Sequence, residues 1–250
     1  MRIYVGVCGF KKKYYTGKIR CVEIQRTFYN IPQVKTVRKW REEAPSDFIF
    51  NIKVFQGLTH VASSPTWRRY TKKLSAKEKG LVGNLKVNEL TKTWIDTYAE
   101  FSRILDARVL VVQTPAKFAP TQENVNHAEK FFEYFVDVID KYGSNAWIGW
   151  EPRGKWLEKP QLIEKIVGNV DRVIHIVDPL IHEPIVVESV AYFRLHGKPY
   201  LNYKYLYEKE DLETILDKVK KLCKKADTVY LMFNNVYMDK NAEELIEMIR

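Results

Sequence analysis

The sequence predicts an α/β protein: an irregular (β/α)₈ barrel of the TIM type, with residues 1–250 forming a single domain. Two observations lead to this prediction. Eight short apolar runs, rich in Val, Ile, Phe and Tyr, have the composition of buried strands, and helical patterns separate most of them. The length of 250 residues also suits a barrel of this kind. A doubly wound open sheet is the alternative fold.

The predicted strands lie at residues 3–8, 21–25, 48–53, 109–113, 147–151, 173–178, 191–196 and 229–234. Helices are expected at residues 33–43, 87–105, 121–142, 161–167, 211–225 and 241–250. The connections 9–20 and 179–190 are too short for ordinary helices, so we expect the barrel to be irregular there. The connection 54–108 is far longer than a normal crossover, which indicates an insertion.

Several broad classes of protein are excluded by composition. The chain has no apolar run of the roughly 18 residues that a membrane-spanning helix needs. Its first residues, MRIYVGVCGF, begin a strand rather than a secretion signal. We therefore expect a cytoplasmic protein with no membrane partner; the oligomeric state leaves no mark on the sequence. The three cysteines are widely spaced, which favours core positions over disulfides or a cysteine zinc site.

The net charge of +10 is concentrated in two stretches. Residues 1–20 hold six Lys or Arg and no acid, and residues 67–86 hold seven with only Glu78 opposing them. Such a local excess indicates an anionic partner, such as DNA or RNA. The alternative is a generic lysine-rich surface of a heat-adapted protein.

Both stretches follow predicted strands, so we expect them to form a cationic rim around one mouth of the barrel. The rim residues are Lys11, Lys12, Lys13, Arg68, Arg69, Lys72 and Lys73. Aromatic residues are interleaved with these cations, a mixture that suits phosphate contact combined with stacking on bases or sugars.

Seven of the eight predicted strands finish in a polar or ionisable residue. In barrels of this class the active site lies at these carboxyl ends. Residues two apart share one face of a strand, so Tyr192, Arg194 and His196 are expected to point into the barrel. The other residues of this set are Glu23, Gln25, Asn51, Lys53, Gln113, Glu151, Arg153, Asp178, Asn234 and Asn235. The alternative is a balanced network of charges that only supports the fold.

The first functional hypothesis is hydrolysis of a phosphoester, in a nucleic acid or a phosphosugar. Lys53, Arg153 and Arg194 would hold phosphate oxygens. Glu151 or Asp178 would act as general base and His196 as general acid. A divalent metal ion is compatible with this hypothesis. Its candidate ligands are His60, Glu23, Glu151, Asp178 and His196. No HxH or HExxH spacing requires it, so the sequence leaves the cofactor open.

Two alternatives remain beside hydrolysis. Lys53 ends an apolar strand, and desolvation there would lower its pKa and allow Schiff-base chemistry of the lyase or aldolase type. The structural alternative for Lys53 is an ion pair with Glu23 or Glu151. The other alternative is a non-catalytic protein that binds anionic ligands. The sequence leaves open whether the chain is an enzyme.

Six segments resemble the YecE-like family, also called domain of unknown function 72. They are VEIQRTFYNIPQVKTVRKW, FIFNIKVFQGLTH, VVQTPAKF, GWEPRGKW, YFRLHG and LMFNN, in this order, and the resemblance covers about residues 3–250. It implies a TIM-type barrel. It also implies a set of recurrent polar positions: Glu23, Tyr29, Lys53, His60, Gln113, Glu151, Arg153, Asp178, Arg194, His196, Asn234 and Asn235. The chain departs from the family after Gly9, where Phe10 and a short basic loop replace Gly-Trp and a longer aromatic segment.

Overall fold

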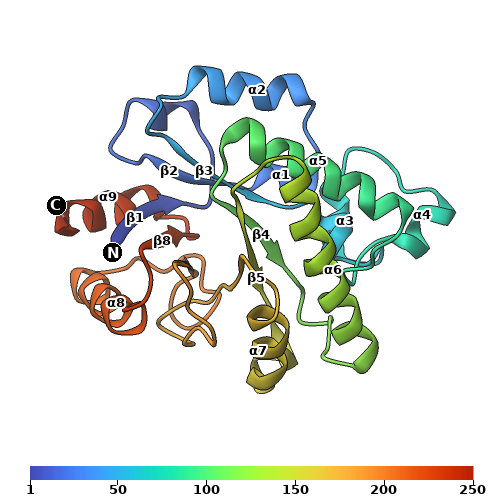
Figure 1. Ribbon diagram of the computed structural model, residues 1–250. Helices are drawn as coiled ribbons and strands as arrows, with labels where there is room; N and C mark the ends of the chain where they lie inside the picture. The colour runs from blue at the N-terminus through green and yellow to red at the C-terminus, as the bar shows by residue number, and fades with distance from the viewer. Residues whose placement is uncertain (250) are drawn as a thin grey trace.

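A computed structural model describes residues 1–249 and contains eight parallel strands that form a nearly closed barrel (Figure 1). The strands are β1 (Arg2–Val7), β2 (Cys21–Ile24), β3 (Ile49–Lys53), β4 (Val109–Gln113), β5 (Trp147–Glu151), β6 (Val173–His175), β7 (Val190–Leu195) and β8 (Thr228–Phe233). Their order is β6-β5-β4-β3-β2-β1-β8-β7. The predicted barrel is thus confirmed, and all eight strands lie within about two residues of the predicted positions at their starts.

The two edges of the sheet meet just beyond β6. The chain after β6 forms a parallel bridge with β7 at Val177 and Phe193, and the Arg194 amide donates a hydrogen bond to the Val177 carbonyl at 3.0 Å. Regular strand geometry therefore ends at His175, three residues before the predicted end of this strand. The bridge almost closes the barrel, which encloses the side chains that point inward.

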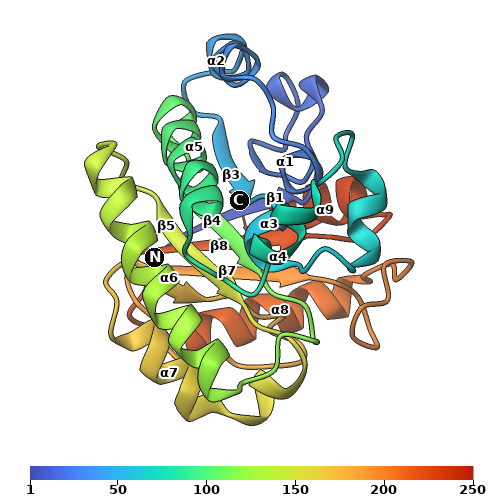
Figure 2. The same ribbon diagram turned by 90° about the vertical axis from the view of Figure 1, so that its right-hand side faces the viewer.

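The helices lie outside the strands, where Figure 2 shows α2, α5, α6 and α7 along the outer surface. They are α1 (Arg26–Tyr29), α2 (Val34–Glu43), α3 (Gln56–Thr59), α4 (Ala76–Leu81), α5 (Glu89–Leu105), α6 (Gln122–Lys141), α7 (Pro160–Gly168), α8 (Lys209–Leu222) and α9 (Met238–Ile249). The six expected helices are present, and α1, α3 and α4 are short additions. Arg250, the last residue of the expected 241–250 helix, lies outside the described residues. No helix within residues 1–249 is long and apolar enough to cross a membrane.

The irregular connections match the prediction. Residues 9–20 carry only a 3₁₀ turn, Lys12–Tyr15, and residues 179–190 carry no helix. The long connection 54–108 holds α3, a 3₁₀ turn at Pro65–Arg69, and α4 before the barrel helix α5 begins. In Figure 1, α1, α3 and α4 lie on the right, on the side toward which β3 runs. This added material therefore lies beside the carboxyl ends of the strands.

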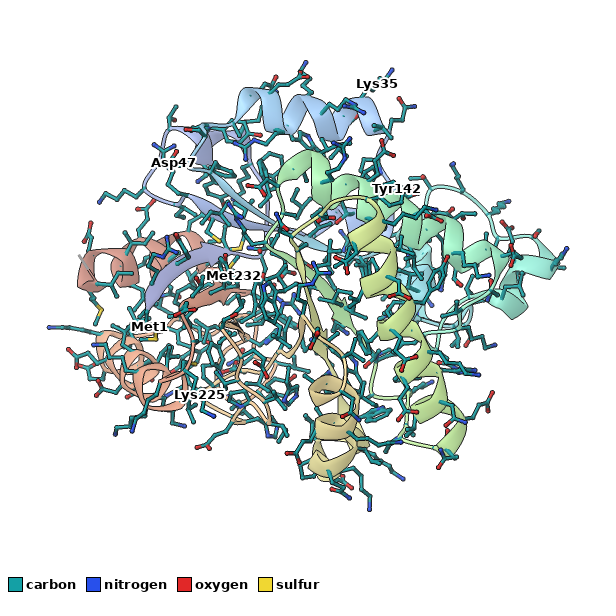
Figure 3. All side chains as sticks on the ribbon, in the orientation of Figure 1. Met1, Lys35, Asp47, Tyr142, Lys225 and Met232 are labelled. Atoms are coloured by element: carbon teal, nitrogen blue, oxygen red, sulfur yellow. The ribbon has the colours of Figure 1, made fainter. Side chains whose placement is uncertain are left out.

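Two apolar cores fill the molecule. The larger lies between strands and helices, and the smaller fills the barrel interior with residues that include Tyr192, Tyr230 and Met232. In Figure 3 Met232 lies near the centre of the molecule. Gly6 is required at the wall of this interior, because a Cβ there would lie 2.4 Å from the Cys21 carbonyl oxygen. All three cysteines are buried and free, as expected. The inner core separates the two ends of the barrel.

Candidate functional site at the carboxyl ends of the strands

Arg194 is at the centre of the polar network inside the barrel. Its Nε and Nη2 atoms donate to the two carboxylate oxygens of Glu23, both at 3.0 Å, and its Nη1 atom donates to Glu151. The side chain is 1% exposed. Burial alone would lower the pKa of Arg194, but the charges of Glu23 and Glu151 outweigh burial and raise it. The guanidinium is therefore held charged in the core by two carboxylates, as buried ions require.

Glu23 receives more donors than Arg194 alone. The Tyr192 hydroxyl donates to Oε2 at 2.9 Å, the Cys8 thiol reaches the same oxygen at 3.5 Å, and Gln25 donates to Oε1. With both oxygens saturated, Glu23 is a fixed structural anion and has no free lone pair directed at a ligand.

Glu151 connects the buried network to the surface. Arg153 donates to its Oε1 atom through Nε at 3.0 Å and Nη2 at 2.8 Å, and the Arg153 side chain keeps 16% exposure. Burial alone would raise the pKa of Glu151, but the charges of Arg153 and Arg194 hold it well below the usual range. Glu151 is thus ionised throughout the neutral range and orients two guanidinium groups, one of which reaches solvent.

His196 is a buried group whose two ring nitrogens both have unused hydrogen-bonding capacity. Within residues 1–249 neither of its ring nitrogens has a hydrogen-bond partner, and Nε2 lies 3.9 Å from a Glu151 oxygen. Burial, aided by the charges of the nearby arginines, lowers the pKa of His196 to about 3, against the opposing charge of Glu151. The rings of Tyr200 and Tyr203 lie against it, each with its centroid 5.9 Å away. The imidazole is therefore neutral and unpaired, the state in which one ring nitrogen donates a hydrogen bond to a ligand and the other accepts one.

Lys53 is the other reactive group of the network. Its ammonium donates to the Gln113 Oε1 atom at 2.8 Å and lies 4.3 Å from the centroid of the Phe28 ring. Neither carboxylate pairs with it, so the expected ion pair with Glu23 or Glu151 is absent. Burial, reinforced by the charge of Arg194, lowers the pKa of Lys53 to about 7. Near neutral pH a substantial fraction of this amine is unprotonated.

Asp178 lies at the end of the irregular segment after β6. Its two carboxylate oxygens accept the backbone amides of His196 at 2.9 Å and Leu180 at 3.1 Å. Burial raises the pKa of Asp178 to about 6, although these hydrogen bonds oppose the shift. The side chain fixes the backbone of His196, and its pKa is closer to neutrality than that of an ordinary aspartate.

His60 and Tyr29 line the Lys53 side of the mouth. The His60 ring contacts Phe28 with centroids 5.1 Å apart, and its Nδ1 atom pairs with the Thr59 hydroxyl at 2.7 Å. Burial and the charges of Lys53 and Arg153 lower the pKa of His60 to about 3. Tyr29 contacts Phe28 edge to face at 5.0 Å, and the Arg69 guanidinium lies 3.6 Å above the Tyr29 ring.

Asn234 and Asn235 follow β8 and lie beside the site. Asn235 is buried and donates to the Tyr205 carbonyl at 2.7 Å and to the Asn241 side chain at 3.0 Å. Asn234 is half-buried, and its backbone amide donates to the Leu195 carbonyl at 2.9 Å. Asn235 thus ties the loop of residues 197–208, which carries Tyr200 and Tyr203, to the barrel, and Asn234 joins the end of β8 to the end of β7.

The two basic stretches differ in their surroundings. Lys11 and Lys13 pair with Asp239 at 3.4 and 2.6 Å, and Lys12 pairs with Glu43 at 2.6 Å. Both acids lie on outer helices, and Tyr14 and Tyr15 of the same turn are buried in the outer core. These lysines are exposed but paired, so acids at this turn partly neutralise the cationic rim expected from the sequence.

The second basic stretch lies beside the site. Arg68, Arg69, Lys72 and Lys73, called here the basic segment, are exposed and form no ion pair with the described residues 1–249. Asn30 holds the segment in place, since it donates to the Arg69 carbonyl at 3.0 Å and accepts the Thr71 amide at 2.8 Å. Through Arg69, Tyr29 and Phe28, the basic segment adjoins Lys53.

The ligands considered for a metal do not converge. Within residues 1–249 no group of three or more His, Cys, Asp or Glu side chains is arranged to hold a metal ion. Arg194 and Arg153 occupy the carboxylates of Glu23 and Glu151, and two backbone amides occupy that of Asp178. We therefore derive no step that uses a metal.

Three parts of the site were not predicted from the sequence. They are Phe28 beneath Lys53, the Cys8 contact to Glu23, and the tyrosines that cover His196. The run GKPYLNYKYLY after β7 carries the signal for the last of these, because four tyrosines crowd a loop that leaves the mouth. Phe28 and Cys8 carry no such signal, since isolated apolar residues are common in any core.

Comparisons with known proteins agree with the barrel fold. The chain is similar to a DUF72 family protein from Enterococcus faecalis V583 (20% identity, 99% and 97% of the two chains covered, TM-score 0.70). It is also similar to one from Thermotoga maritima MSB8 (22% identity, 100% and 99% covered, TM-score 0.63). A more distant similarity in fold joins it to 3-keto-D-glucoside 4-epimerase from E. coli (10% identity, 99% and 100% covered, TM-score 0.60). No curated protein matches the chain.

The family to which the chain belongs is established by its sequence. The family model described as "Protein of unknown function DUF72" matches residues 11–250, nearly the whole chain. The matched region contains every polar side chain of the site except Cys8, and the resemblance seen in the six sequence segments is thereby confirmed. The chain belongs to the DUF72 family.

Proposed function

We propose that the carboxyl-end mouth of the barrel binds a phosphate-bearing ligand, either a nucleic acid or a phosphosugar. The observation that carries this proposal is the continuous path from exposed to buried cations. The basic segment is exposed and lacks acidic partners in residues 1–249, and its Arg69 stacks on Tyr29, which contacts Phe28 beneath Lys53. Arg153 supplies a second partly exposed guanidinium. Arginine and lysine in this arrangement suit phosphate oxygens.

The same geometry supports phosphoester hydrolysis as the reaction of the bound ligand. Asp178, with a pKa of about 6, would take the proton of the attacking water, and the bond from phosphorus to the leaving oxygen would break. A phosphate group beside His196 would raise the pKa of its ring, which could then protonate the leaving oxygen. Glu151 is held ionised by two arginines, so its proposed part is to position Arg153 rather than to accept a proton.

The test is a binding titration with labelled single-stranded DNA, RNA and a phosphosugar, followed as fluorescence anisotropy or by competition. Replacing Arg68, Lys72 and Lys73 with Ala should weaken binding of the oligonucleotides and flatten its salt dependence by up to about 3 units of slope. The matched control replaces Lys220, Lys221 and Lys224, exposed residues at the end of α8, and should change little. Equal affinity of the two triple variants would contradict the proposal.

Cleavage is tested separately from binding. Wild-type protein and Asp178→Asn are incubated with end-labelled oligonucleotides and with phosphosugars, and products are resolved by electrophoresis or phosphate release. Hydrolysis is supported if the wild type turns over a substrate that Asp178→Asn still binds but no longer cleaves. Binding without turnover would leave a binding protein and remove the hydrolytic step.

A second candidate function rests on one observation, the Lys53 amine with a pKa of about 7. Such an amine adds to an aldehyde carbonyl and expels water to form an imine. Borohydride reduction in the presence of a phosphorylated aldose would convert the imine to a secondary amine, which mass spectrometry would locate on the peptide containing Lys53. Labelling of exposed lysines with equal efficiency, or no adduct at Lys53, would contradict this candidate.

A further inference from the structure

The opposite end of the barrel carries a cavity that the mouth does not use. It has a volume of about 550 Å³ and lies at the amino ends of the strands, where the chain enters β1, β3, β5 and β8. In Figure 3, Met1 and the cavity residue Asp47 both lie on the left side of the molecule, the side on which β1 begins. A cavity of this size matches the range of small-molecule sites, roughly 300–1,000 Å³. We call it the floor pocket.

Three arginines line the floor pocket, and they differ in how far they are already paired. Arg108 pairs with Asp106 at 2.9 Å, and Arg20 approaches Asp47 at 4.0 Å and donates to the Tyr15 carbonyl. The exposed Arg2 guanidinium has no hydrogen-bond or ion-pair partner in residues 1–249. Arg2 and Arg108 line the same pocket as Tyr230, so both guanidinium groups belong to one cavity.

Aromatic rings form the base of the pocket. Tyr4 stacks on Tyr230 with centroids 5.5 Å apart and planes 18° apart, and Trp147 is half-buried in the same lining. The partly exposed rings of Tyr4 and Trp147, in a pocket with the unpaired Arg2 guanidinium, suit a ligand that has both a planar group and an anionic group. Asp47 and Asp106 on the rim supply exposed carboxylates, which accept hydrogen bonds from hydroxyl groups.

We propose that the floor pocket binds a mononucleotide. Arg2 and Arg108 contact the phosphate, the base lies against Tyr4 and Trp147, and the ribose hydroxyls donate to Asp47 or Asp106. A mononucleotide carries an anion, a flat ring and vicinal hydroxyls together, so each of the three kinds of lining residue has a matching group on it. The inner core of Tyr192, Tyr230 and Met232 lies between this pocket and the mouth, which makes the floor pocket a second, independent site.

The experiment is isothermal titration calorimetry of the full chain with AMP, adenosine and inorganic phosphate. We expect one AMP per chain, with weaker binding of adenosine and of phosphate because each lacks part of the contact. The variant Arg2→Gln/Arg108→Gln should bind AMP roughly tenfold or more weakly, the loss expected for charge-assisted hydrogen bonds. The control Lys35→Gln/Lys221→Gln removes the same charge from exposed sites away from the pocket and should bind as the wild type does.

One further variant, Lys53→Met, separates the floor pocket from the mouth. This variant removes a cation of the mouth, so it should weaken binding of a phosphate-bearing ligand there, while AMP should still bind at the floor pocket. Arg2→Gln/Arg108→Gln should do the reverse, and thermal unfolding confirms that each variant is folded. The proposal is overturned by any of three results: no heat with AMP, equal AMP affinity in the Arg2/Arg108 variant, or loss of AMP binding in Lys53→Met alone.

Discussion

Arg194 and Glu23 form a bidentate ion pair inside the barrel. Both nitrogen–oxygen distances are 3.0 Å, and both side chains are at most 1% exposed. The pair links β7 to β2, which β8 and β1 separate in the strand order. The other guanidinium nitrogen of Arg194 reaches Glu151. The ion pair thus fixes the position of the site's carboxylates before any ligand arrives.

Breaking this pair from one side should strongly destabilise the fold. We expect Glu23→Gln and Arg194→Met each to lower the free energy of unfolding by about 3–5 kcal/mol, because the partner is left as a buried, uncompensated charge. Urea denaturation monitored by circular dichroism measures this. The exposed pair of Lys209 and Glu213 is the control, and Lys209→Gln should change stability by about 0.5 kcal/mol or less. Losses below about 1 kcal/mol in the buried variants would contradict the account.

Lys53 should make stability rise with pH above neutrality. The unfolded chain holds this proton up to the ordinary pKa of 10.5, whereas the folded protein releases it at about 7. Between these values the unfolded state binds more protons, so stability increases with pH. Lys53→Met should remove this increase and raise stability at pH 7 by on the order of a few kcal/mol. Parallel pH profiles for the wild type and the variant between pH 7 and 10 would show that the amine has no shifted pKa.

Asp178 should have the opposite effect at lower pH. The folded protein keeps the carboxyl proton up to about pH 6, and the unfolded chain loses it near 3.8. The folded state binds more protons in this window, so this group's contribution to stability is full below about pH 4 and is lost as pH rises through 6. Asp178→Asn should abolish the decline, which in the wild type amounts to about 3 kcal/mol. Urea denaturation at half-unit pH steps decides the point; an unchanged slope in the variant refutes it.

The tyrosines of the 197–208 loop should control the titration of His196. Replacing both Tyr200 and Tyr203 with Ala opens the ring to water, so the pKa of His196 should rise from about 3 toward its ordinary value of 6.5. NMR titration of the imidazole carbon-bound protons measures this shift, and the five histidines of the chain keep the spectrum simple. Tyr142→Ala, at the end of α6, should leave the His196 titration as it is.

The inward direction of Tyr192, Arg194 and His196 could be predicted because strand side chains alternate strictly and the barrel has one polar end. The partner of Lys53 could not be predicted. It required the distance between β3 and β4, where Gln113 is closer to the ammonium than either glutamate, and only the folded register sets that distance. Lys11 and Lys13 illustrate the same limit, since their acid, Asp239, lies more than 220 positions away in the chain. Local charge counts identify an excess of cations but not the acids that fold against them.

The most direct test of the proposed phosphate site at the mouth records the NMR resonances of His196 and His60. Inorganic phosphate and a phosphosugar are added in turn at constant pH. We predict saturable shifts at both histidines, a raised pKa of His196 in the bound state, and loss of the shifts in Lys53→Met and Arg153→Gln. His127 on the outer helix α6 should not respond. Unchanged His196 and His60 resonances at saturating ligand would contradict the claim that phosphate binds at the carboxyl ends of the strands.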